Sequence, residues 1–121
     1  MKDLITAKRV LLSEAKPPDL SITMSEILEN ENCRILAVKM WDGAVLKRHH
    51  ANVPITVLCL SGSGVFKAGS ELEEQRLLEP GVLLSLPALI EHEVAPTPEL
   101  VIVVTKYKQE VPTATTSGEE Q

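Results

Sequence analysis

The chain has 121 residues, of which 44% are hydrophobic and only 2% aromatic, and its formal net charge is −5. This length allows one domain with a single modest core, which must be built mainly from Leu, Val and Ile. The negative charge and the scarcity of aromatic side chains argue against binding of a nucleic-acid backbone or of stacked bases, so we expect no nucleic-acid partner.

The two cysteines indicate the redox compartment. Cys33 and Cys59 lie in apolar, strand-like runs and form no CxxC motif, which is typical of buried free thiols in a reducing compartment. The N-terminus has no apolar run of signal-peptide length, and no stretch reaches the ~18 apolar residues that a membrane span requires. We therefore expect a cytoplasmic protein with no membrane partner.

Residues 1–19 form an N-terminal arm. The arm contains an apolar run at 10–12 and is stopped by Pro17 and Pro18. We expect it to add a strand to the main domain or, by exchange, to a second subunit.

The pattern from residue 20 to 108 is mostly β. Short apolar runs, each roughly 5–8 residues long, alternate with turn signals, which is typical of an all-β sandwich or barrel. We expect the β-strands to be interrupted at 61–64 and again at 96–98, where Gly and Pro cluster. The polar residues 109–121 lack periodicity and predict a disordered tail. The predicted strands cover 21–27, 33–40, 44–49, 55–60, 65–68, 73–78, 82–86, 91–95 and 100–107.

One stretch resembles the first motif of the cupin family, which reads G-x5-H-x-H-x3,4-E-x6-G. Gly43, His49 and Gly62 occupy the first glycine, the first histidine and the last glycine of this pattern. Ala51 stands at the position of the second histidine, and Ile55 stands at the position of the glutamate.

A second stretch resembles the second cupin motif, G-x5-P-x-G-x2-H-x3-N. Gly81, Pro87 and His92 fall in frame without a gap. Leu89 replaces the glycine and Pro96 replaces the asparagine. Two motif frames in the right order make the resemblance specific for the fold.

The resemblance covers roughly residues 20–108 and implies an all-β fold, a single-domain double-stranded β-helix that forms a jelly-roll-like cupin barrel. Cupin sites hold Fe, Mn, Ni, Cu or Zn with three histidines and a glutamate. Of those four positions, His49 and His92 keep their ligands in this chain. His50 could supply a third ligand if a bulge at 51–52 turned its side chain inward. The resemblance therefore implies a degenerate site that holds a metal weakly or not at all.

Strand alternation extends the candidate cavity beyond the motif positions. If Ile55 faces inward, Cys59 does so too, and Met40 precedes the turn that carries the first motif glycine. We therefore expect a ligand cavity lined by His49, Ile55, Cys59, His92 and Met40. Cys59 beside a histidine could form a soft metal site or a nucleophile pair, or it could be an inert core residue.

Three functions follow from these observations. The first is a small barrel that binds an unidentified small molecule in its central cavity, with a degenerate metal site. The second is a metal-dependent enzyme, similar to cupin dioxygenases or isomerases, that uses His49, His92 and His50. The third is a non-catalytic sensor or structural module. We assign no catalytic residue, and we expect a homodimer under each of these functions, with 100–107 as a candidate contact face.

Overall fold

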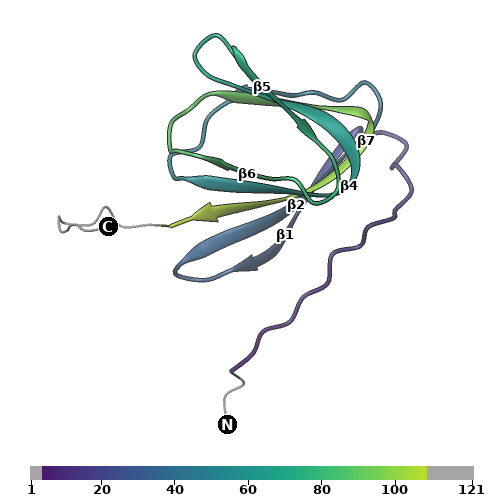
Figure 1. Cartoon of the computed structure of the whole chain (residues 1–121). Helices are drawn as coiled ribbons and strands as arrows, with labels where there is room; N and C mark the ends of the chain where they lie inside the picture. The colour runs from purple at the N-terminus through teal and green to yellow at the C-terminus, as the bar shows by residue number, and fades with distance from the viewer. Residues whose placement is uncertain (1–3, 109–121) are drawn as a thin grey trace, which may run out of the picture.

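The computed structural model describes residues 4–108, which fold into an all-β structure (Figure 1). Residues 1–3 and the predicted disordered tail, 109–121, lie outside the described residues. No helix of the described chain is long and apolar enough to cross a membrane. The all-β prediction is confirmed. The strands are β1 (Ile22–Glu29), β2 (Cys33–Met40), β3 (Leu46–His49), β4 (Ile55–Ala68), β5 (Glu74–Leu78), β6 (Leu83–Leu86) and β7 (His92–Tyr107).

Two long strands, β4 and β7, form the spine of the barrel. They pair antiparallel, so the first half of β4 lies beside the second half of β7 and the second half of β4 lies beside the first half of β7. The remaining edges of β7 are taken by β2 and β3, and those of β4 by β5 and β6. The sheet order is β1-β2-β7-β4-β5, with β1 paired to the free edge of β2. Both halves of the spine contribute side chains to one core.

The predicted break at 61–64 is wrong, because β4 continues through it. The register with β7 shifts on either side of Gly62, so the strand bends there without ending. Gly62 has a φ of +77°, and a Cβ atom at this position would lie 2.0 Å from the carbonyl oxygen of Glu99. A glycine is therefore required for the close approach of the two backbones, and the turn signal in the sequence marks a bend within a strand.

The predicted break at 96–98 is wrong for a related reason. β7 runs through Pro96 and Pro98 opposite the bend of β4. No residue between Pro96 and Leu100 is paired with β4. Proline lacks a backbone N–H, so it is tolerated where the ladder is already interrupted.

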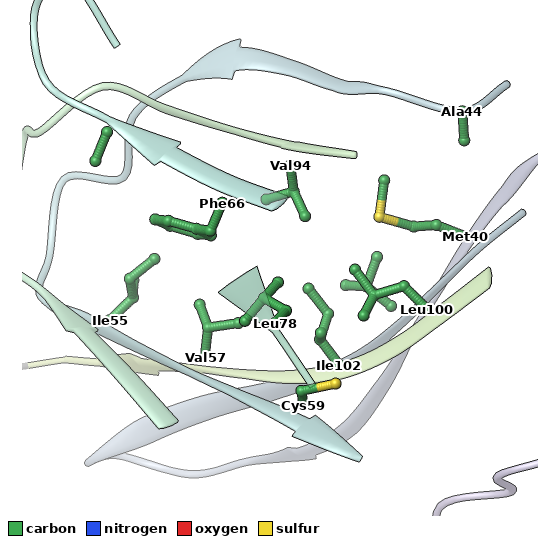
Figure 2. Close-up of a cluster of buried hydrophobic side chains, with 12 residues drawn as sticks. Met40, Ala44, Ile55, Val57, Cys59, Phe66, Leu78, Val94, Leu100 and Ile102 are labelled. Atoms are coloured by element: carbon green, nitrogen blue, oxygen red, sulfur yellow. The ribbon is translucent and has the colours of Figure 1, made fainter. Parts of the chain in front are cut away.

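The core lies between the two halves of the barrel, and Figure 2 shows its long axis. Ile55 and Phe66 lie at one end, whereas Met40 and Leu100 lie at the other. Cys59 lies between these ends and has no exposed surface. The core is therefore mainly aliphatic, and Trp41 and Phe66 are its buried aromatic residues, as the composition predicts.

Residues 4–19 of the arm contain no strand, and much of the arm runs away from the barrel (Figure 1). Glu14 forms an ion pair with Lys39 of β2, whose side chain is buried. A buried ammonium group requires a partner, so this pair holds the adjoining part of the arm against β2. Exchange of the arm between subunits and the homodimer both stay predictions, which sedimentation at micromolar concentration would test.

Candidate functional site

Two histidines meet where β3 and β7 pair. His49 lies directly opposite His92 in the antiparallel register. Their ring centroids are 4.2 Å apart, and the rings are inclined at 61° to each other in an edge-to-face arrangement. The residues that hold the first histidine position of one motif and the histidine position of the other are therefore in contact.

A β-bulge in β3 makes this contact possible. Leu46 and His49 are three residues apart, but their partners on β7, Val94 and His92, are only two apart. The extra residue on β3 puts Leu46 and His49 on the same face of the sheet, whereas a regular strand would place them on opposite faces. The sequence suggested 51–52 as a position where a bulge could turn His50 inward, whereas the bulge found in β3 lies before His49.

The histidine pair lines a cavity of about 90 Å³ at one end of the barrel. The side chains around its mouth, His49, His50 and Met24, are exposed, whereas those on its floor are buried and aliphatic. Ala51 and Ile55, which stand where the cupin motif has its second histidine and its glutamate, also line it. The full set of lining residues is Met24, Leu36, Val38, Leu46, His49, His50, Ala51, Ile55, Val57, Phe66, His92, Val94, Ile102, Val104 and Lys106.

Both rings are held by the same local hydrogen bond. Nδ1–H of His49 donates to the carbonyl oxygen of Lys47 at 2.7 Å, and Nδ1–H of His92 donates to that of Ile90 at 3.0 Å. A carbonyl oxygen can only accept, so each bond fixes the proton on Nδ1. When the rings are neutral, both Nε2 atoms carry lone pairs, and residues 4–108 provide neither with a hydrogen-bond donor.

His92 is the more enclosed of the two rings and is only 4% exposed. Phe66 stacks on it with a centroid distance of 5.4 Å and an interplanar angle of 12°. Burial lowers the pKa of His92, the hydrogen bond to Ile90 opposes that effect, and the nearby His49, His50 and Lys106 lower the pKa further. His92 is therefore held as a neutral imidazole.

Of three other residues predicted for the site, two do not line the cavity and one lies at its exposed mouth. Met40 and Cys59 are packed in the core beyond the cavity and do not line it. Burial raises the pKa of the Cys59 thiol, which donates to the carbonyl oxygens of Ser61 and Gly62 at 3.6 and 3.8 Å. This thiol is therefore kept protonated and away from both imidazoles. His50 does line the cavity, but at its exposed mouth.

Several lining residues were not predicted from the sequence, among them Phe66 and Lys106. Lys106 shares a face with Ile102 and Val104 by strand alternation, and all three line the cavity. That alternation is visible in the sequence once the strand is known to be continuous. Phe66 lies beyond the bend of β4, so its face could not be read from the alternation that precedes the bend.

The donors present do not fit a tightly bound divalent metal. Cupin metal sites use four side chains, but here two of those positions are the aliphatic Ala51 and Ile55. Within residues 4–108, no three His, Cys, Asp or Glu side chains are grouped closely enough to hold one ion. Two imidazoles without a carboxylate form an incomplete ligand set for the metals of this fold.

A larger groove lies between β5 and β6 on the other side of Phe66. Its volume is about 530 Å³, and Phe66 lines both this groove and the histidine cavity. The charged groups of the groove already have protein partners. Arg76 pairs with Glu74 at 2.7 Å, and the Glu73 carboxylate accepts a hydrogen bond from the backbone N–H of Glu71 at 2.9 Å.

Comparison with known proteins shows the fold. No family model and no curated protein matches the sequence. The structure is similar to an RmlC-like cupin protein from Desulfovibrio desulfuricans, with a TM-score of 0.74 and 22% identity over 85% of this chain and 97% of that one. It is also similar to a cupin superfamily protein from Desulfitobacterium hafniense DCB-2 (TM-score 0.70, 17% identity, 81% of this chain and 85% of that one). A third similar structure is KdgF from Halomonas sp. (TM-score 0.65, 18% identity, 81% and 88%). The predicted cupin double-stranded β-helix is confirmed.

Proposed function

We propose, with the cupin fold as the premise, that this chain binds a small organic molecule in the cavity beside His49 and His92 and does so without a tightly held metal. The cavity is apolar apart from a few nitrogen-bearing side chains, as small-molecule sites commonly are. Its position at one end of the barrel leaves the mouth open to solvent, where His49 and His50 are exposed.

The observation that carries this proposal is the fixed tautomer of both imidazoles. The backbone holds Nδ1 of each ring and leaves each Nε2 without a donor from the described chain. His92 is the buried ring of the two, and a buried acceptor without a donor is costly. A bound molecule with an O–H or N–H group would remove that cost. The two acceptors lie on rings in contact, so one small molecule could reach both.

A screen of small fragments by ligand-observed NMR tests the proposal. The fragments should include neutral, anionic and cationic compounds of a few heavy atoms, because the cavity volume is about 90 Å³. We expect binding to the wild-type chain and loss of binding in Ala51→Leu, which adds bulk to a half-buried cavity wall.

Ser85→Leu is the matched control, because Ser85 lines the larger groove and not the cavity. Fragments that bind in the cavity should be lost only in Ala51→Leu. Loss of binding only in Ser85→Leu would move the site to the groove, and an absence of hits from the whole screen would refute the proposal.

A further inference from the structure

The cavity has an unbalanced charge. Its polar side chains are three imidazoles and one ammonium group, and no Asp or Glu is among the lining residues. The chain as a whole has a net charge of −5, so this one-sided lining is a local exception. Lys106 is the only lysine or arginine among these lining residues.

Lys106 lies opposite Ile55 in the pairing of β4 with β7. Directly opposed residues present their side chains to the same face of a sheet, with Cβ atoms about 5 Å apart. The side chain of Lys106 therefore lies beside that of Ile55, the residue at the glutamate position of the motif. No carboxylate of residues 4–108 forms an ion pair with Lys106.

Neighbouring charges on β1 and β2 do not compensate for Lys106. Arg34 is the β2 residue opposite Lys106, and it is paired with Glu26 at 2.9 Å. The Glu26 carboxylate is therefore already paired with Arg34. Lys39, the buried lysine of β2, is likewise paired, with Glu14 of the arm. Lys106 differs from these two cations in facing an apolar cavity without an anion.

We propose that the ligand of this cavity is a small organic carboxylate whose anionic group pairs with Lys106 while its apolar part lies against Ile55 and the floor. This inference rests on the proposed function. A charge-assisted hydrogen bond between an ammonium and a carboxylate is strengthened where aliphatic walls lower the local dielectric. The volume of about 90 Å³ restricts the ligand to a short chain.

Titration of the full chain with three probes of similar shape tests the proposal: butanoate, its uncharged isostere pentan-2-one, and n-butylammonium. Affinities are measured from backbone amide shifts in NMR. We expect butanoate to bind at least about tenfold more tightly than either other probe. We expect Lys106→Met to weaken butanoate about tenfold and to leave pentan-2-one unchanged, and Lys106→Arg to retain most of the butanoate affinity.

Lys47→Met is the matched control, because Lys47 is exposed on β3 and does not line the cavity. This variant loses the same charge and should bind butanoate as the wild type does. Equal affinity for butanoate and pentan-2-one, or butanoate binding that survives Lys106→Met unchanged, would overturn the inference. If the screen yields only neutral or cationic ligands that Ala51→Leu abolishes, the proposed function stands and the carboxylate inference fails.

Discussion

The histidine cavity and the groove between β5 and β6 share a wall but differ in chemistry. The groove is the larger space, at about 530 Å³ against about 90 Å³. Its charged side chains already have protein partners: Arg76 and Glu74 form an exposed pair, which contributes little to stability, and Glu73 accepts a backbone hydrogen bond. The cavity is smaller, but Lys106 and the two Nε2 atoms of its histidines have no partner within the described residues.

The difference favours the cavity as the candidate site, because its polar groups lack partners although its volume is smaller. A polar group that has a protein partner has little to gain from a ligand, whereas a partly buried group without one gains the full hydrogen bond. The following experiments test whether the histidine cavity and the groove differ in packing and chemistry as described.

The largest effect on stability is expected from removing the ring of Phe66, which lines both spaces. Phe66 is 5% exposed and separates the two spaces. Phe66→Ala should lower the free energy of unfolding by about 3–5 kcal/mol, because it removes buried apolar surface and leaves a void. Urea denaturation measures this loss. Leu83→Ala, an exposed change in the groove, should cost no more than ~0.5 kcal/mol. Equal losses in both variants would contradict the packing described for Phe66.

The next effect concerns Ala51 and Ile55, which stand where the cupin motif has a histidine and a glutamate. Ala51→His combined with Ile55→Glu would add an imidazole and a carboxylate to the cavity that already holds the histidine pair. We expect this double variant to bind Zn²⁺ or Ni²⁺ at least ~100-fold more tightly than the wild type, which corresponds to about 2.7 kcal/mol. Calorimetric titration measures the affinity. Each single variant serves as a control and should gain less, and a double variant that binds no better than either would show that the four positions do not converge.

The smallest effect is the pH dependence of stability. His92 has a lowered pKa in the folded protein, chiefly through burial, so the unfolded chain binds more protons below its ordinary pKa of about 6.5. Stability from this group is therefore present above pH ~6.5 and is lost as the pH falls below it, by at most ~1.4 kcal/mol per pH unit.

Urea denaturation of the wild type between pH 7.5 and 5 measures this slope. His92→Phe and His92→Gln both remove the titrating group but change the packing differently, so both should flatten the slope. A slope that persists in both variants would assign the acid sensitivity to another residue.

The sequence predicts most strands of this fold but misreads its bends. Glycine and proline clusters normally end strands, and at 61–64 and 96–98 they instead occupy the point where β4 and β7 bend together. The local signals of a turn and of a bend within a strand are the same, because both need a backbone that only glycine adopts or a position without a ladder hydrogen bond. Only the pairing partner distinguishes the two.

The candidate site shows a second limit of sequence reasoning. Strand alternation correctly gives Ile55 and Cys59 the same face, and both are core residues. Alternation does not show how far from the cavity each side chain lies along the strand. Four residues of strand span about 13 Å, so Cys59 lies well below the cavity that Ile55 lines. Lys106 went unrecognised for a related reason, because alternation assigns it to a face of β7 but does not show that this end of the strand borders the cavity.

The bulge in β3 makes the contact between His49 and His92 depend on chain length more than on residue type. Lys47 and Arg48 can each be replaced while the backbone keeps its extra residue. A single-codon deletion at either position would remove that residue and reverse which face of the sheet the side chains before His49 occupy relative to His49. Leu46 and His49 could then no longer share a face. Variation in this segment should therefore consist of substitutions and exclude one-residue deletions.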